Sequence, residues 1–288
     1  MTTSRPDGRS RALRRLLFAG VLAAAGVLAW ALWIGPRRLV VTRTELELPG
    51  WPKPLAGLRV ALISDLHVGS PFWDLDALSR LVARTNAEAP DLVLLAGDYL
   101  INNVWGGHFV APEPIAERLG ALRAPLGVHA VLGNHDWWND GERTRAALAA
   151  RGIDVLEESA RRLESAGAGF YLVGLADQLT RRSNPRAVLA ALPADAPALV
   201  LVHEPDVFDE LSREDRPPTL TLAGHTHGGQ VWLPLLGRQV VPSRFGQRYA
   251  YGHVVENGRH LFVTSGVGTS IFPIRLLVPP EIALLTLR

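Results

Sequence analysis

Acidic, amide and imidazole side chains stand where short apolar segments of the chain end. Asp65 and His67 follow the apolar residues 58–63, and Asp98 follows residues 91–96. Because strand ends in layered α/β proteins converge along one edge, loops distant in sequence can meet there. The full set of candidate groups is Asp65, His67, Asp98, Asn134, His135, His203, His225 and His227.

Carboxylate, amide and imidazole groups together are typical ligands of Mn²⁺, Zn²⁺, Fe or Mg²⁺. The chain contains no cysteine, which excludes thiolate metal sites and disulfides. An isolated Asp after a strand more often caps a turn or helix, and an isolated His is more often structural. Their recurrence at successive strand ends, beside glycines that permit tight turns, favours one metal centre instead. These glycines are Gly69, Gly97, Gly133, Gly224 and Gly228.

Strands that alternate with helices in the first half, and a tail richer in strands, must position this centre. The pattern predicts an α/β protein in which two mixed sheets pack together with helices outside them. We expect one catalytic domain over residues 36–288. The predicted strands span residues 40–48, 58–63, 91–96, 127–132, 153–156, 169–173, 198–202, 219–223, 261–265 and 282–287, and the predicted helices span 75–87, 114–122 and 144–151.

An uncharged apolar run over residues 16–35 is about long enough to cross a bilayer as a helix. We expect a single-pass transmembrane anchor that follows a basic segment, residues 1–15. Five arginines precede the run, so the positive-inside rule favours an extracytoplasmic catalytic domain, although the residues just after the run, Arg37, Arg38 and Arg43, are also basic. A cleaved signal peptide is the competing interpretation, and the pair Arg14-Arg15 adds a hint of twin-arginine export. The bulky end of the run, without a small-x-small site, favours the anchor.

The composition is that of an ordinary globular protein. Of the 288 residues, 48% are hydrophobic and 20% are charged, which excludes a disordered chain. The net charge is +2 and no basic stripe is interleaved with aromatic residues, so nucleic acid is not an expected partner. Lys53 is the single lysine, so the abundance of arginine reflects overall composition and does not mark phosphate contacts.

The motifs occur in the order of a known signature. Asp65-Leu66-His67, Gly97-Asp98, Gly133-Asn134-His135-Asp136, His203 and Gly224-His225-Thr226-His227 resemble the calcineurin-like metallophosphoesterases. The tail motifs His225-Thr226-His227-Gly228-Gly229-Gln230, Gly268-Thr269-Ser270 and Pro279-Pro280-Glu281-Ile282 resemble the bacterial branch that includes YkuE, YaeI and LpxG. The resemblance implies a four-layer α/β/β/α sandwich of two mixed β-sheets for everything after the anchor.

The resemblance also implies roles for the candidate groups and two divalent metal ions as cofactors. Asp65, His67 and His227 would hold one ion, whereas Asn134, His203 and His225 would hold the other. Asp98 would bridge both ions. His135 would stand beside the substrate phosphate or the leaving oxygen, where an imidazole can donate a proton.

The implied activity is hydrolysis of phosphodiester, phosphomonoester or pyrophosphate bonds by a hydroxide bridging two metal ions, at or near the membrane. A sharper alternative is a pyrophosphatase for a UDP-2,3-diacylglucosamine-type nucleotide lipid of lipid A synthesis. The expected partners are a lipid- or envelope-linked phosphate ester and the membrane. Segment 97–103 lacks the Asp-Arg pair of the family's protein phosphatases, which disfavours phosphoprotein substrates.

Two other classes are weaker. A non-catalytic, membrane-tethered metal-binding scaffold is disfavoured because every motif ligand is present, and a mononuclear metalloprotease because no His-Glu-x-x-His occurs. Outside the motifs we expect structural roles. Asp136 should support its turn and Glu204 should lie behind the ligands, whereas the tryptophans should pack under the loops rather than form an apolar substrate wall. The residues left out of the site are His108, His129, His253, His260, Arg181, Arg182, Trp105, Trp137 and Trp138.

Overall fold

The first of two six-stranded sheets carries the early motifs. The computed structural model describes residues 8–213 and 218–288. The strand order of this sheet is β1-β14-β2-β3-β4-β5, in which β2 to β5 are parallel and β14 runs antiparallel to β2. The strands are β1 (Val40–Leu46), β2 (Leu58–Ile63), β3 (Leu92–Ala96), β4 (Val128–Val131), β5 (Asp154–Val155) and β14 (Glu281–Leu287).

The second six-stranded sheet carries the late motifs. Its order is β12-β13-β9-β8-β7-β6, with a parallel centre and an antiparallel strand at each edge. Both sheets are therefore mixed, as predicted. The strands are β6 (Ser159–Ser165), β7 (Ala168–Gly174), β8 (Ala198–Leu201), β9 (Leu220–Ala223), β12 (Gly252–Glu256) and β13 (Arg259–Val263), and a separate small hairpin is formed by β10 (Trp232–Leu233) and β11 (Gly237–Arg238).

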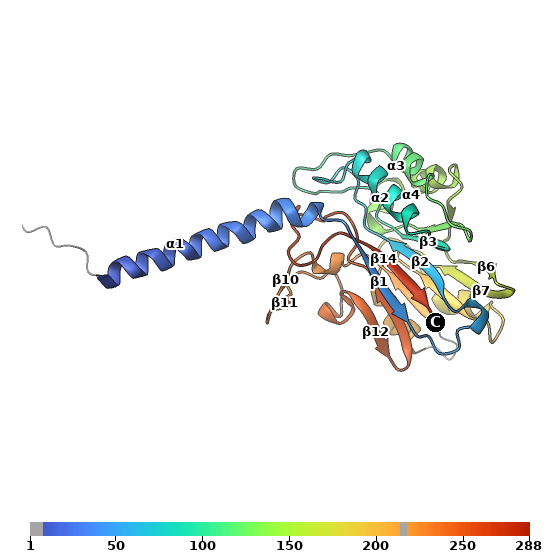
Figure 1. Cartoon of the computed structure of the whole chain (residues 1–288). Helices are drawn as coiled ribbons and strands as arrows, with labels where there is room; N and C mark the ends of the chain where they lie inside the picture. The colour runs from blue at the N-terminus through green and yellow to red at the C-terminus, as the bar shows by residue number, and fades with distance from the viewer. Residues whose placement is uncertain (1–7, 214–217) are drawn as a thin grey trace, which may run out of the picture.

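Alternation along the strands shows how the layers are stacked. Successive side chains of a strand point to opposite faces, so a central strand buried on both faces serves two cores. In β2, Ile63 packs against the outer helices, whereas Leu62 packs between the two sheets. In β8, Leu201 packs between the sheets and Val200 packs on the far side. The fold is therefore the predicted α/β/β/α sandwich (Figure 1).

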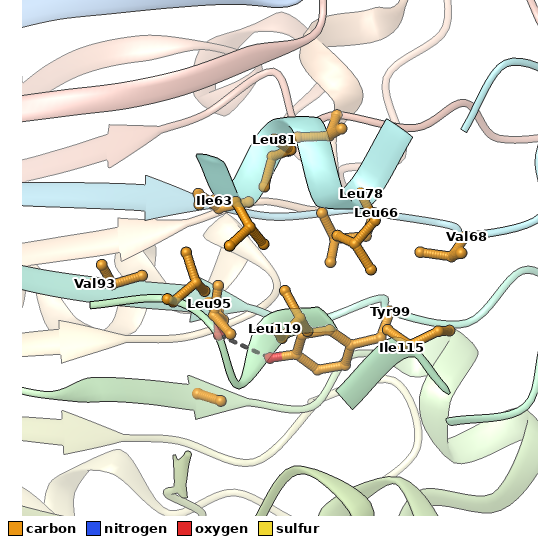
Figure 2. Packing of buried hydrophobic residues seen from close by; sticks show 14 of the residues in the cluster. Ile63, Leu66, Val68, Leu78, Leu81, Val93, Leu95, Tyr99, Ile115 and Leu119 are labelled. Carbon is orange, nitrogen blue, oxygen red and sulfur yellow. Dashed lines mark hydrogen bonds between the residues drawn. The ribbon is translucent and has the colours of Figure 1, made fainter. Parts of the chain in front are cut away.

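Helices close the outer face of each sheet. Figure 2 shows Leu78 and Leu81 of one helix packed with Ile63 and Leu95 of the strands. Phe208 and Leu211 close the second sheet. The helices on the first sheet are α2 (Leu75–Ala87), α3 (Pro112–Leu119) and α4 (Asn134–Ala149), and those beyond the second sheet are α5 (Pro185–Ala190) and α6 (Phe208–Leu211).

The N-terminal apolar run is helical and projects from the domain (Figure 1). Helix α1 (Gly8–Ala29) continues through a π-helical turn at Trp30–Ile34 and a 3₁₀ turn at Gly35–Arg37. Among the described residues, one helix, residues 11–37, is long and apolar enough to cross a membrane. Helix α1, with 22 residues, is about 33 Å long, against a hydrocarbon core of about 30 Å.

Candidate metal centre

The structure brings all eight candidate groups together. They follow the carboxyl ends of β2, β3, β4, β8 and β9, which point to one edge shared by the two sheets. The ligand atoms within each of three overlapping groups lie within 4.8 Å of one another. The groups are Asp65, His67 and His227; Asp98, His203 and His225; and His67, Asp98 and His135.

Asp98 stands between the first two groups. Its Oδ2 lies 3.6 Å from Nε2 of His67 and 3.2 Å from Nε2 of His203. Asn134 belongs to the second group because its Oδ1 lies 3.1 Å from the same His203 Nε2. A single carboxylate thus faces two sets of buried ligand atoms, which is the geometry needed to bridge two cations.

The donor set fits metal ions because lone pairs converge on it. Nδ1 of His67 donates to the carbonyl of Leu100 at 3.1 Å, and Nδ1 of His203 donates to the carbonyl of Ala96 at 2.7 Å. These backbone acceptors assign the proton of each neutral ring to Nδ1, so that Nε2 is the atom that binds a metal ion when it carries no proton. The Nε2 of His67 then faces the Nε2 of His227 at 3.2 Å. Oδ1 of Asp65 is buried and finds no hydrogen-bond partner among the residues that the structure describes. Such acceptor-rich contacts are favourable when cations lie between them.

The pKa values follow from this crowding. Burial lowers the pKa of His67 and of His225 to about 3, so both imidazoles stay neutral and available as ligands. Burial raises the pKa of Asp65 to about 6. Burial also opposes charge on His203 and Asp98, but their mutual attraction outweighs it. The pKa of His203 lies well above its ordinary value and that of Asp98 well below. The space between the His203 ring and the Asp98 carboxylate therefore favours a positive charge.

Five candidate ligands adopt a left-handed backbone conformation that side chains other than glycine rarely take. Such conformations are costly and concentrate at functional sites, where the surrounding structure enforces them. Here they turn each strand end sharply, so that the side chain points back into the centre. The residues are Asp65 (φ 54°), His67 (φ 41°), Asp98 (φ 58°), His225 (φ 67°) and His227 (φ 50°).

Asp136 supports the motif loops, as predicted. Its carboxylate accepts hydrogen bonds from the backbone amides of Gly133, Asp98 and Tyr99 at 2.9 Å and of Leu100 at 3.1 Å. Burial raises its pKa to about 7. One side chain therefore ties the loop after β3 to the start of α4. The helix predicted over residues 144–151 in fact begins at Asn134, and Asp136 caps its first turn.

His135 stands at the open side of the centre. Its Nε2 lies 4.0 Å from Oδ2 of Asp98, and its ring packs 5.0 Å from the ring of Trp138. Trp138 is more than half exposed and lines the cavity above the centre, so the apolar-wall alternative holds for this tryptophan. Trp137 instead packs against the core, as expected.

The other histidines have structural contacts. His129 bonds Asp154 and the carbonyl of Leu126, and His253 pairs with His260 at 2.9 Å. None of these three belongs to a group of converging ligand atoms in the described part of the chain.

The sequence did not point to Arg275 as a support of the site. Its buried guanidinium donates to the carbonyls of Gly268, Ser265 and Val278, and the Gly268 amide donates to the carbonyl of Asp65 at 2.6 Å. Burial lowers the pKa of Arg275 to about 10. Arg275 thus fixes the loop beneath Asp65. In a chain so rich in arginine, no sequence signal distinguishes it.

Two cavities meet at the metal centre. One, of about 660 Å³, lies over Asp98 and His135 and is lined by the apolar side chains of Trp138, Val240, Ile271, Phe272 and Ile274. The other, of about 880 Å³, is more polar, and its lining includes Gln178, Arg181, Ser183, Asp206 and Arg244. Leu179, His225 and Pro242 line both cavities. The centre is therefore flanked by one apolar and one polar space.

Comparison with known proteins identifies the family. The calcineurin-like phosphoesterase family model matches residues 58–229, a span that begins with β2 and ends just after His227. The chain belongs to this family. It is a metal-dependent phosphoester hydrolase, and the family's divalent metals fit the converging ligands described above.

Relatives place the chain in the predicted bacterial branch. It is 30% identical to the metallophosphoesterase YkuE of Bacillus subtilis (strain 168), over 94% of this chain and 93% of the relative. It is 34% identical to the phosphodiesterase YaeI of Escherichia coli (strain K12), over 81% and 83%. It is 27% identical to the UDP-2,3-diacylglucosamine pyrophosphatase LpxG of Chlamydia trachomatis serovar D, over 92% and 94%.

Proposed function

We propose that this hydrolase uses two divalent ions to cleave a phosphate ester at the membrane surface. The observation that carries the proposal is the position of Asp98 between two sets of ligand atoms. Asp65, His67 and His227 would hold one ion, and Asn134, His203 and His225 the other. Asp98 would bridge them. When bound, the two metal ions would supply a nucleophilic water and neutralise charge on the phosphoryl oxygens.

The chain's own groups complete the chemistry. The amide of His135 donates to Oδ1 of Asp98 at 2.9 Å, which aligns the first turn of α4 with the bridging carboxylate. The pKa of His135 is lowered by burial, and its ring lies at the edge of the cavity. We infer that this imidazole contacts the leaving oxygen and transfers or shares a proton there as the bond to phosphorus breaks.

A nucleotide-lipid pyrophosphatase is the second candidate. LpxG matches nearly the whole chain, and its name describes a pyrophosphatase for a diacylated, UDP-linked substrate. The apolar cavity suits the lipid part of such a molecule, and the more polar cavity suits its nucleotide part. Topology separates the candidates, because a cytoplasmic centre favours the nucleotide lipid and an extracytoplasmic centre favours envelope phosphodiesters. We propose the extracytoplasmic arrangement, and C-terminal reporter fusions test it.

The proposal is tested on the purified full-length chain in detergent. Metal content and hydrolysis of bis-p-nitrophenyl phosphate are measured with and without added Mn²⁺, for the native chain and for Asp98→Asn. We expect metal-dependent turnover that collapses in Asp98→Asn. Asp154→Asn is the matched control, because Asp154 pairs with Arg161 and His129 away from the centre. A folded native chain without bound metal or turnover under any divalent ion would exclude the proposal.

A further inference from the structure

The end of the apolar helix packs on the catalytic domain, and we call this contact, between residues 31–37 and residues 72, 73 and 275, the helix seat. The amide of Arg275 donates to the carbonyl of Ala31 at 2.9 Å, and the indole of Trp73 donates to the carbonyl of Pro36 at 3.0 Å. Arg37 packs over the rings of Trp33 and Phe72, with its guanidinium carbon 3.5 Å and 3.8 Å from their centroids. These contacts orient the domain relative to the helix.

Large apolar side chains are exposed beside this seat. We call Trp33, Leu235, Leu236, Ile271 and Phe272 the apolar rim. Leu235 is fully exposed at 105%, and Trp33 and Phe272 are exposed at 62% and 60%. Leu235 and Ile271 also adopt left-handed backbone conformations (φ 71° and 61°) that are unfavourable for bulky residues. Strained, exposed apolar residues are poorly explained by the stability of a domain in water.

Hydrogen bonds join the rim to the seat. The side-chain amide of Gln230 donates to the carbonyls of Ser270 and Phe272. The amide of Leu276, next to Arg275, donates to the carbonyl of Gln230, and the amide of Trp232 donates to the carbonyl of Leu276. Trp232 begins the β10–β11 hairpin, whose turn carries Leu235 and Leu236. Figure 1 shows this hairpin at the side of the domain from which α1 leaves.

The helix sets the depth of the rim. A spanning α1 would leave the hydrocarbon near Trp30 and Trp33, and tryptophan side chains favour the membrane–water interface. The contact between Ala31 and Arg275 then holds the rim at the same depth. Exposed Arg37 and Arg38 follow at the level of the lipid head groups, where cations attract anionic lipids.

The rim also borders the apolar cavity. Exposed Ile271 and Phe272 also line the cavity that holds Asp98 and His135, so the rim forms part of the wall of that cavity. The polar cavity lies beyond His225 and contains Arg181 and Arg244. A phosphate ester at the centre would therefore have an apolar space toward the rim and a polar space on the other side.

We propose that the apolar rim docks into the surface of the lipid bilayer, so that the apolar cavity opens at head-group depth. The substrate is then a phospholipid-type ester whose lipid part reaches the centre from the membrane and whose polar part occupies the second cavity. The docking stands on the rim and the helix seat alone. The substrate class rests on the proposed function.

Docking is tested with a single fluorescent label, because the chain has no native cysteine. Leu235→Cys is labelled with an environment-sensitive dye in the full chain, reconstituted into vesicles of phosphatidylethanolamine with a minority of phosphatidylglycerol. We expect a blue-shifted emission that is quenched by a quencher attached to the lipid chains. Ala166→Cys, in the exposed turn between β6 and β7, is the control and should report water.

Two outcomes overturn the docking. One is a label at position 235 that reports water, as the control does. The other is a blue shift without quenching by the lipid-borne quencher, which would mean that a second copy of the chain covers the rim. Neither outcome depends on catalytic activity.

The substrate class is tested with two matched phosphodiesters of 4-methylumbelliferone, one esterified to dioleoylglycerol in vesicles and one to ethanol in solution. The double variant Leu235→Asn, Leu236→Asn removes the apolar tip, and asparagine tolerates the left-handed backbone at 235. We expect turnover of the vesicle substrate to fall about ten-fold or more, with the soluble substrate unchanged. Equal turnover of vesicle lipid by the native and double-variant chains refutes the inference. If the native chain turns over neither substrate, the proposed function itself is refuted.

Discussion

The carbonyl oxygen of Arg275 occupies the space where a side chain at Gly35 would lie. A Cβ built on Gly35 would stand 2.0 Å from this oxygen, far inside van der Waals contact. Gly35 is buried and its backbone conformation is an ordinary helical one, so close approach alone requires glycine. The backbone of Gly35, at the end of the apolar helix, therefore packs directly against the backbone of Arg275, which supports the metal centre.

Gly35→Ala tests this seat. The added methyl group must displace the Arg275 backbone, so we expect destabilisation of about 1–3 kcal/mol, the usual cost of overpacking. Thermal unfolding of the full chain in detergent measures it. Gly26→Ala is the matched control, because nothing lies within 4 Å of a Cβ at that position. Equal melting temperatures for the two variants would show that the helix end does not pack on the domain.

Gly133→Ala should impair the metal centre without removing a ligand. A Cβ at Gly133 would lie 2.3 Å from Oδ1 of Asp98 and 2.8 Å from Cε1 of His203. We expect lower metal content by elemental analysis, together with lower turnover of bis-p-nitrophenyl phosphate. Gly169→Ala is the control, because its nearest neighbour is the flexible end of Arg162 at 3.0 Å. Full metal occupancy in Gly133→Ala would mean that the loop relaxes without moving Asp98.

The central strands and the site residues were predictable because their signals are local. Buried strands such as β2, β3 and β9 read as apolar runs, and each is followed by a ligand type at a short, fixed distance. The two edge strands of the second sheet gave no such signal. β6 and β12 contain no fully buried residue and were not predicted, because an edge strand packs few apolar side chains, although each pairs in a hairpin with the strand that follows it.

The features that arise from tertiary contact were also not predictable. The left-handed backbone of His67 and the seat of Ala31 on Arg275 depend on segments far apart in the sequence. The same holds for Trp138, whose exposure over the cavity distinguishes it from its neighbour Trp137. Sequence periodicity carries no information about these three features, because it describes a segment and not the surface that the segment contacts.

His135→Ala should reduce turnover by a factor that depends on the leaving group. If His135 protonates or stabilises the leaving oxygen, its loss matters most when that oxygen is a poor leaving group. We expect a smaller fall in turnover for an alkyl aryl phosphodiester whose leaving group is p-nitrophenolate. For a dialkyl phosphodiester, turnover should fall on the order of a hundred-fold or more. Metal content should stay near the native level, because the proposed ligands are intact.

His253→Ala is the control for this prediction, since His253 contacts His260 on β12 and β13 and lies outside the centre. Steady-state rates over a series of leaving groups of different pKa give the decisive slope. A steeper decline of rate with leaving-group pKa in His135→Ala than in the native chain supports proton transfer, because the native imidazole levels the difference between good and poor leaving groups. Parallel slopes with a uniform drop would assign the imidazole of His135 to positioning of the phosphate and not to proton transfer. Unchanged rates for every leaving group would remove His135 from the mechanism.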